Sequence, residues 1–436
     1  MKADGSIDKF KARLVIQGFR QQEGIDYFDT YAPVARISTI RLLIALGAIH
    51  NLVIHQMDVK TAFLNGDLEE EVYMKQPEGF IMPGMEHKVC KLVKSLYRLK
   101  QPPKQWHQKF DEVVLSVQQF HVKQSGQQID TSGNGVIICL YVDDMLIFGT
   151  NQNQVDRTKE FLPSSFSMKD MGEAEVILGI RIKRENKGIA ITQSHYIEKV
   201  LKKFNYFDCS PVSTPYDSSV KLMPNSGEAV SQLEYSKAIG CLMYLMTNTR
   251  LNPSAQHWQA IRRVFKYLKK TIDYGLSYVG FLSVLEGYSD TSWITNREDH
   301  SSTSGWGGAI SWALKKQTCI MSSTMESEFV VLAAAGKESG WLRNLVHEIP
   351  LWPKPISPIS ICCDSLTTLS KAYSKVYNGK FRHLGVRHSM ICELITNGVI
   401  LVEFVRSQQN LADHATNGLA RDLVHKSVIG MGLKSI

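Results

Sequence analysis

Two short apolar runs that flank a pair of acidic residues form the clearest pattern in the chain. Residues 136–140 and 145–148 are each of strand length and rich in bulky or β-branched side chains, with glycine beyond both outer ends. This pattern predicts a β-hairpin with Asp143 and Asp144 in its turn. Adjacent carboxylates raise each other's pKa unless a cation binds them, so the pair indicates a metal site. The alternative is a turn that contains aspartate only because aspartate suits turns.

The N-terminal part of the chain supplies a second carboxylate and two cations. The apolar residues 52–54 and the following residues 56–59 (QMDV) predict a strand that ends near Asp58. Asp58 becomes a candidate ligand if this strand and the hairpin are neighbours. Two carboxylates from different strands suit a magnesium site that also binds phosphate. Residues 9–18 alternate cations and apolar residues as a half-exposed strand does. Lys11 and Arg13 then point toward phosphate, or they belong to a solvated basic edge.

Acidic residues in the last third of the chain follow apolar segments. The stretch Ser323-Thr324-Met325-Glu326 fits a capping box at the start of a long helix, so Glu326 is expected to cap it and Glu328 to be the functional acid. One acid is expected on this helix and three at strand or loop ends: Glu328, and then Asp290, Asp364 and Asp413. Each alone is typical of a protein surface, and only the ordered set of four indicates a site.

Composition narrows the class of protein. With 436 residues, 44% hydrophobic and 21% charged, the chain is expected to form two or three globular domains. The formal charge of +8 is weak support for a polyanionic partner. The eight cysteines show no C-x-x-C pair, which argues against a zinc module and for reduced thiols. There is no signal peptide and no apolar run of about 18 residues, so a soluble cytoplasmic or nuclear protein is expected.

Three longer stretches resemble the reverse transcriptase of a copia-type LTR retrotransposon Pol polyprotein. They are residues 56–80 (QMDVKTAFLNGDLEEEVYMKQPEGF), 95–106 (SLYRLKQPPKQW) and 140–149 (LYVDDMLIFG). The segments SSTMESEF, CCDS and NLAD resemble the ribonuclease H domain of the same polyprotein. The resemblance implies an α+β fold: a polymerase right hand of fingers, palm and reduced thumb, whose palm sheet carries the YVDD hairpin, and then a ribonuclease H-like α/β domain with a mixed sheet. It implies fingers and palm over residues 1–205, a shortened thumb and connection over 206–280, and the ribonuclease H-like domain over 281–436.

The resemblance also implies the chemistry. The expected activity is RNA-directed DNA synthesis together with hydrolysis of the RNA strand of a hybrid. The partners would be an RNA template, a DNA primer, an RNA–DNA hybrid and deoxynucleoside triphosphates. Two Mg²⁺ ions would bind at each active site, and Mn²⁺ could replace them. The implied catalytic acids are Asp58, Asp143 and Asp144 in the polymerase, and Asp290, Glu328, Asp364 and Asp413 in the nuclease; all except Asp144 are implied metal ligands. The implied nucleotide-binding residues are Lys11, Arg13, Phe63 and Tyr141, of which Phe63 would crowd the sugar 2′ position.

Several departures from the family pattern suggest a truncated, partly degenerate copy. Arg98 and Pro102 stand where relatives have glycine and alanine, so a bulky cation is added and a backbone donor is lost. Residues 120–133 look altered, the chain looks shortened after Arg250 and after Trp306, and residues 414–417 differ from the usual ending. Loss of half a hairpin after Trp306 would remove core area and unpair backbone groups. The alternative function is therefore an inactive relic that at most binds nucleic acid. Its basic amphipathic helix over residues 257–270 would follow a nucleic-acid backbone, unless it is an ordinary surface helix.

Overall fold

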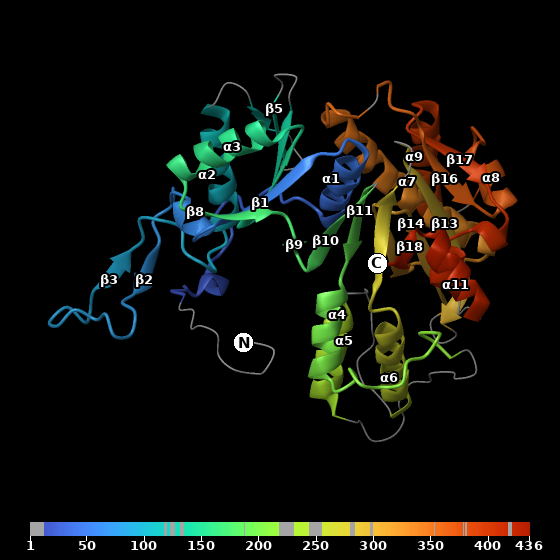
Figure 1. Ribbon diagram of the computed structural model, residues 1–436, viewed down its shortest axis with the longest axis horizontal. Helices are drawn as coiled ribbons and strands as arrows, with labels where there is room; N and C mark the ends of the chain where they lie inside the picture. Colours follow the sequence, from blue (N-terminus) through green and yellow to red (C-terminus); the bar gives the residue numbers. More distant parts are fainter. Residues whose placement is uncertain are drawn as a thin grey trace. The chain divides into compact units, whose positions relative to one another are not determined.

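The computed structural model describes most of the chain as two compact units, Met1–Ala174 and Glu175–Ile436 (Figure 1). The described residues are 13–116, 120–122, 127–130, 135–186, 188–217, 231–243, 255–279, 284–296, 300–352, 354–377, 379, 382–416 and 421–436. Lys11, and the segment around Arg250 where a deletion is expected, lie outside them. None of the described helices is both long and apolar enough to span a membrane.

The first unit is built on a six-stranded antiparallel sheet with the strand order β4-β5-β6-β7-β1-β8. Its strands are β1 (Val53–Val59), β4 (Phe120–Val122), β5 (Gln127–Asp130), β6 (Val136–Tyr141), β7 (Asp144–Gly149) and β8 (Met168–Glu173). Two helices, α2 (Pro102–Ser116) and α3 (Gln152–Ser165), pack on one face. Trp106 and Phe110 of α2 lie in this core against Met57 and Met145 of the sheet. Because side chains alternate along a strand, the neighbouring positions Asp58 and Asp144 face the other side.

The remaining elements of the first unit are short or lie outside the large sheet. They are η1 (Gly18–Arg20), α1 (Ile37–Ile49), η2 (Ala62–Asn65) and the two-stranded ribbon of β2 (Tyr73–Lys75) and β3 (Val89–Lys91). The strand expected over residues 9–18 is wrong for its described part. There Val15 forms a single bridge with Tyr97, and the chain then turns into η1. Gly18 makes this turn possible by packing directly on the Arg98 carbonyl, as described below.

The second unit begins with a five-stranded sheet and three helices. The sheet has the order β18-β12-β11-β10-β9, formed by β9 (Val176–Ile177), β10 (Ile180–Glu185), β11 (Gly188–Thr192), β12 (Tyr274–Val279) and β18 (Leu433–Ser435). The helices α4 (Ser194–Lys203), α5 (Gln232–Met243) and α6 (Ala255–Lys270) share one apolar core around Leu201 and Phe265. This sheet joins segments from all three parts of the expected domain division, which stays a prediction.

The last part of the second unit is a mixed sheet with helices packed on it. The order β15-β14-β13-β16-β17 is antiparallel on one side and parallel on the other. The strands are β13 (Glu286–Asn296), β14 (Ser301–Gly307), β15 (Trp312–Lys316), β16 (Ile359–Cys363) and β17 (Ile400–Phe404). The helices are α7 (Thr324–Glu348), α8 (Leu366–Ala372), α9 (Arg382–Thr396), η3 (Ser407–Gln409), α10 (Asp413–Thr416) and α11 (Arg421–Gly430). Residues of α7, α8 and α9 form one core with β16 and β17.

The hairpin of β14 and β15 is complete, contrary to the expected loss after Trp306. Gly307 lies opposite Trp312, and the Gly308 N–H donates to the Ser311 carbonyl at 2.9 Å. β14 also pairs with β13 along its other edge. The expectation of a lost half-hairpin was wrong, because residues 308–311 close the turn and leave both ladders of β14 paired.

Candidate active sites

The turn between β6 and β7 holds one acidic residue rather than two. Tyr141 at the end of β6 lies opposite Asp144, so the turn consists of Val142 and Asp143, and Asp144 is already part of β7. Val142 has φ of +58°, a value that β-branched residues rarely adopt. The Trp106 Nε1–H donates to the Val142 carbonyl at 2.7 Å. This bond ties the turn to α2 and helps to compensate its backbone strain.

Asp58 lies beside the hairpin because β1 is the neighbour of β7. Asp58 is opposite Asp144 in the antiparallel register, and the Val59 N–H donates to the Asp143 carbonyl at 2.8 Å. Paired positions on adjacent strands place their side chains on the same face. The strands are therefore neighbours, as the sequence analysis required, and the structure brings Asp58 next to Asp144.

Asp58, Asp143 and Asp144 form a first cluster, in which the pKa of Asp144 is raised. Its side chain is half-buried, and burial raises its pKa, with further increases from the charges of Asp143 and Asp58. Gln56 offsets part of this effect, because its Nε2–H donates to Asp144 Oδ1 at 3.2 Å. Sequence reasoning missed Gln56, although its place two residues before Asp58 puts it on the same strand face. A cation at this face would relieve the repulsion between the carboxylates.

Tyr97 connects the acids to the expected nucleotide-binding residues. Its ring centroid is 5.3 Å from that of Phe63 in η2, and the Arg13 guanidinium carbon lies 5.4 Å from the Tyr97 centroid. Burial raises the pKa of Tyr97; Arg13 lowers it, and the charges of Asp143 and Asp58 raise it further. Arg13, Phe63 and Tyr97 thus gather beside the aspartates. Sequence reasoning did not single out Tyr97, although it lies within the quoted stretch 95–106.

Arg98 is strained, whereas Pro102 is well placed. Arg98 has φ of +76°, in the left-handed region that favours glycine. A Cβ on Gly18 would lie 1.8 Å from the Arg98 carbonyl oxygen, so the two backbones are in direct contact. Pro102 is the first residue of α2, where a backbone donor is not needed by the helix. Pro102 therefore costs the helix no hydrogen bond, and its expected effect on nucleotide and template contacts stays a prediction, while Arg98 introduces a local backbone strain.

The second unit contains the four predicted nuclease acids, each from a different part of the fold. Asp290 lies in the middle of β13 rather than at a strand end as expected, because β13 continues to Asn296 in its pairing with β14. Glu328 is on the second turn of α7, and Asp364 follows β16 directly. Asp413 is the first residue of α10. Ser323 caps α7 by accepting from the Glu326 N–H, as expected, while the Glu326 carboxylate accepts from Ser322.

Asp290 and Glu328 are buried, and the charges of the other carboxylates act on both of them. Asp290 and Glu328 are 4% and 7% exposed. Burial, together with the charges of Asp364 and Asp413, raises the pKa of Asp290 to about 6, although a hydrogen bond from Thr416 counteracts this. Burial, followed by the charges of Asp290 and Asp364, raises the pKa of Glu328 to about 9. The structure therefore brings together all four predicted acids of this site.

Hydrogen bonds position Asp290 and one oxygen of Glu328, whereas the other oxygen of Glu328 has no described partner. Glu328 Oε1 accepts from the Thr291 N–H at 3.2 Å, and the Thr416 hydroxyl donates to Asp290 Oδ2. Asn410 positions the loop before α10, since its Nδ2–H donates to the Ser289 carbonyl at 3.0 Å. Glu328 Oε2, by contrast, is buried without a hydrogen-bond partner among the described residues. An unpaired buried carboxylate oxygen is costly unless a cation or a proton satisfies it.

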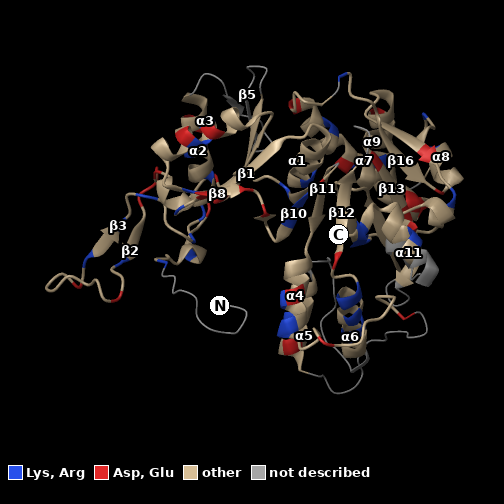
Figure 2. Cartoon of the chain, in the orientation of Figure 1, with Lys and Arg blue, Asp and Glu red and all other residues tan. Residues whose placement is uncertain are grey.

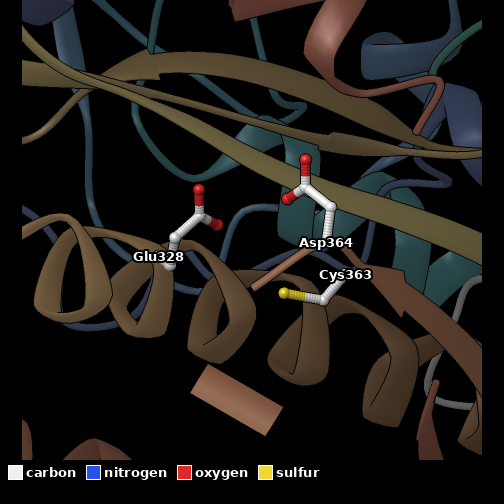
Figure 3. A group of neighbouring side chains, drawn as sticks. All are labelled: Glu328, Cys363 and Asp364. Carbon is white, nitrogen blue, oxygen red and sulfur yellow. The ribbon is translucent and has the colours of Figure 1, made fainter. Parts of the chain in front are cut away.

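A cysteine lies at the edge of the second cluster. Glu328, Cys363 and Asp364 offer ligand atoms that all lie within 4.8 Å of one another, as Figure 3 shows. Sequence reasoning treated Cys363 only as a buried thiol, although it immediately precedes Asp364. The aspartates of the first cluster, at positions 58, 143 and 144, do not form an equally compact set.

The basic face of α6 contacts a neighbouring segment of the same chain. Figure 2 shows basic residues along α6. Arg263 donates to the Thr214 carbonyl at 3.2 Å, to the Thr214 hydroxyl at 2.8 Å and to Asp217 Oδ2 at 3.1 Å. Lys270 donates to the Ser213 hydroxyl at 3.0 Å. These cations hold residues 213–217 in place, which favours the surface-helix interpretation for them.

Comparison with protein families decides the lineage. The family model described as reverse transcriptase (RNA-dependent DNA polymerase) matches residues 1–218. The chain belongs to the reverse transcriptase family. This reverse transcriptase homologue is 37% identical over 468 residues to the Retrovirus-related Pol polyprotein from transposon TNT 1-94 of Nicotiana tabacum. The alignment covers 99% of this chain and 35% of that relative. Pol polyproteins of this kind are copia-type, so the predicted resemblance is confirmed. The chain spans about a third of the length of the plant Pol polyproteins it matches.

Two solved structures are similar to this member of the reverse transcriptase family. The foamy viral protease-reverse transcriptase in complex with dsDNA is 13% identical, with a TM-score of 0.40, and the match covers 83% of this chain and 70% of that chain. RNase H1 from the halophilic archaeon Halobacterium salinarum NRC-1 is 16% identical, with a TM-score of 0.22, over 33% of this chain and 98% of that chain.

Proposed function

We propose that the chain is an RNA-directed DNA polymerase with a ribonuclease H activity. The first cluster would join deoxynucleotides to a DNA primer on an RNA template, and the second would hydrolyse the RNA strand of an RNA–DNA hybrid. The observation that carries the proposal is the recurrence of a carboxylate cluster, assembled from residues distant in sequence, in each of the two units. Membership of the reverse transcriptase family supports the first activity.

The residues of both clusters fit Mg²⁺. Magnesium prefers carboxylate oxygens and binds through a few of them together with phosphate and water. In the second cluster, Glu328 Oε2 is the orphaned atom that a cation would satisfy, with Asp290, Asp364 and Asp413 as further ligands. In the first cluster, Asp58 and Asp143 would hold the ions, which Mn²⁺ could replace. When bound, a pair of such ions activates the attacking oxygen and neutralises charge on the phosphate.

The protein's own side chains would supply orientation and specificity around the first cluster. Gln56 holds Asp144 through its amide, and the Trp106 bond to Val142 fixes the turn that carries Asp143. Phe63, packed against Tyr97, would crowd the sugar 2′ position and select deoxynucleotides. Arg13, and Lys11 outside the described residues, would contact the triphosphate, and Tyr141 would lie beside the nucleotide.

The proposed architecture follows the same assignment. The sheet with the β6–β7 hairpin would be the palm of a right-handed polymerase, the ribbon of β2 and β3 would belong to the fingers, and the helices α4, α5 and α6 would form a reduced thumb. The mixed sheet with α7 would be the ribonuclease H-like domain.

Primer extension on an RNA template tests the first activity. We expect Mg²⁺-dependent incorporation of deoxynucleotides by the purified chain, and none by an Asp143→Asn variant with an unchanged circular dichroism spectrum. Extension that does not exceed the level of this variant would overturn the polymerase assignment.

Hydrolysis of a labelled RNA–DNA hybrid tests the second activity. We expect Asp290→Asn to abolish cleavage and Glu326→Gln to preserve it, because Glu326 caps α7 and a glutamine can do the same. Equal cleavage by the Asp290→Asn variant would contradict the assignment of the second cluster.

The second candidate function is a catalytically inactive relic that at most binds nucleic acid. The strained backbone at Arg98, beside Tyr97 and the first cluster, is the observation that favours it. This function predicts binding that weakens steeply with salt and is the same in the Asp143→Asn variant. Turnover that depends on the carboxylates would exclude it.

A further inference from the structure

We propose that Glu328, Cys363 and Asp364 form a binding site for a thiophilic divalent cation such as Zn²⁺ or Cd²⁺. The site shares two carboxylates with the proposed nuclease centre and adds a sulfur ligand that Mg²⁺ does not use. An ion held by Cys363 would therefore compete with Mg²⁺ at the second cluster. This competition rests on the proposed function, whereas the binding itself does not.

Two of the three ligands are adjacent in sequence, and the third comes from a helix that packs against them. Glu328 reaches in from α7, while Cys363 ends β16 and Asp364 follows it. Alternation along β16 directs Cys363 toward the core that contains α7, and Figure 3 shows its sulfur near both carboxylates. Each residue offers one ligand atom, and all three atoms lie within 4.8 Å of one another.

The separations bring the three ligand atoms within reach of a single ion of the zinc type after side-chain rotation. Zn–S and Zn–O bonds are about 2.3 Å and 2.1 Å, so a sulfur and an oxygen bound tetrahedrally to the same ion lie about 3.6 Å apart. The ligand atoms lie within 4.8 Å of one another, and on binding the side chains would rotate to bring them closer together. A water completes a tetrahedral set of four ligands.

A second observation points to a ligand at this place. Glu328 is 7% exposed, and its Oε2 has no hydrogen-bond partner among the described residues. Cys363 is fully buried, while Asp364 is only half-buried and gives an ion access from solvent. A cation between these atoms satisfies the unpaired oxygen.

The thiol determines which ions the site selects. Thiolate ligands favour zinc and other soft ions, whereas Mg²⁺ and Ca²⁺ prefer oxygen. On binding, the S–H bond of Cys363 breaks, the sulfur forms a bond to the metal, and the proton passes to solvent. No oxidant or reductant is needed.

Titration of the full chain with CdCl₂, followed by ultraviolet absorption, tests the proposal. A cadmium–thiolate bond produces a charge-transfer band, and we expect one saturable equivalent in the unmodified chain. Cys363→Ala should remove this band. Cys362→Ala is the matched control, because it deletes the adjacent half-buried thiol and should leave the band in place.

A second variant keeps the test decisive if Cys363→Ala does not fold. Glu328→Gln retains the thiol but loses one charged ligand, so we expect at least tenfold weaker Cd²⁺ binding. An unchanged band and affinity in a folded Cys363→Ala protein, or an unchanged affinity in Glu328→Gln, would overturn the site. Absorption does not depend on turnover, so a chain without nuclease activity would still show the band. Absence of the band would overturn the cadmium site without deciding whether the chain hydrolyses RNA with Mg²⁺.

Discussion

Replacing Glu328 with glutamine should make the metal-free protein progressively more stable, relative to the unmodified chain, as pH rises. The folded state raises the pKa of Glu328 from 4.5 to about 9, chiefly through burial and then through the charges of Asp290 and Asp364. A carboxyl whose pKa is raised on folding keeps its proton in the native state and loses it in the unfolded state. Its contribution to stability is complete below pH 4.5 and is lost progressively as pH rises toward 9.

The magnitude follows from proton linkage. One proton retained only by the folded state lowers the free energy of unfolding by about 1.4 kcal/mol for each pH unit. From pH 4.5 to pH 7 the loss amounts to about 3 kcal/mol. Glutamine has the same shape, can still accept from the Thr291 N–H, and does not titrate. Its cost is an amide at the position of the unpartnered Oε2, about 1 to 3 kcal/mol and independent of pH.

Urea unfolding in EDTA at a series of pH values, followed by circular dichroism, measures this effect. The stability of the Glu328→Gln variant relative to the unmodified chain should increase by about 1.4 kcal/mol per pH unit between pH 5 and pH 8. Glu326→Gln is the matched control on the same helix, and its difference from the unmodified chain should not change in the same way. A Glu328→Gln difference that stays constant across this window would refute the electrostatic description of the second cluster.

Addition of Mg²⁺ extends the same experiment. A cation bound to ionised Glu328 replaces the proton in stabilising the buried carboxylate. Saturating Mg²⁺ should therefore raise the free energy of unfolding of the unmodified chain more than that of the variant. Equal stabilisation of both proteins would show that Mg²⁺ does not bind through Glu328.

Three substitutions test other features of the fold. Arg98→Gly should raise the free energy of unfolding by about 1 kcal/mol by relieving the left-handed backbone, whereas Arg98→Ala, which keeps a Cβ, should not; equal effects in urea unfolding would contradict the strain. Tyr373→Phe should lower the free energy of unfolding by about 1 kcal/mol, because the Tyr373 hydroxyl donates to the Val402 carbonyl and accepts from the Val402 N–H on the edge strand β17. An unchanged midpoint of urea unfolding would contradict this role. Trp106→Phe should cost about 2 kcal/mol through the lost bond to Val142 and the lost volume, and a neutral result would show that the turn is held otherwise.

The sequence was sufficient for the parts of the fold that depend on local pattern. The apolar runs around Asp143 give β6 and β7, and the position of Asp58 after an apolar segment gives β1. The ordered acids of the last third also converge as expected, since the charges of Asp290, Asp364 and Asp413 all raise the pKa of Glu328. The strands follow from alternation, which acts over a few residues, whereas the convergence of the four acids was expected from their order and from the family resemblance.

The missed details arise from contacts between distant residues. The turn begins at Val142 rather than Asp143, and Trp106, which is 36 positions away, helps to hold that strained residue. The break between β9 and β10 falls at Leu178 and Gly179, which both take positive φ. Cysteine spacing likewise did not indicate the site proposed at Cys363, because Glu328 lies 35 positions earlier in the chain, on α7.

The two carboxylate clusters differ in how far the protein itself compensates their charge, and this difference bears on whether the chain is a relic. In the first cluster, the Gln56 amide offsets part of the repulsion on half-buried Asp144. In the second, Glu328 Oε2 has no described partner, so the cluster depends more strongly on a proton or a cation. Two of the departures that suggested damage leave the local fold intact, because Pro102 begins a helix and the β14–β15 hairpin is complete, while Arg98 is expected to cost about 1 kcal/mol. A strain of that size is well below the about 5 to 15 kcal/mol that typically stabilises a domain, so an effect of Arg98 on activity would come from its position beside Tyr97 rather than from failure to fold.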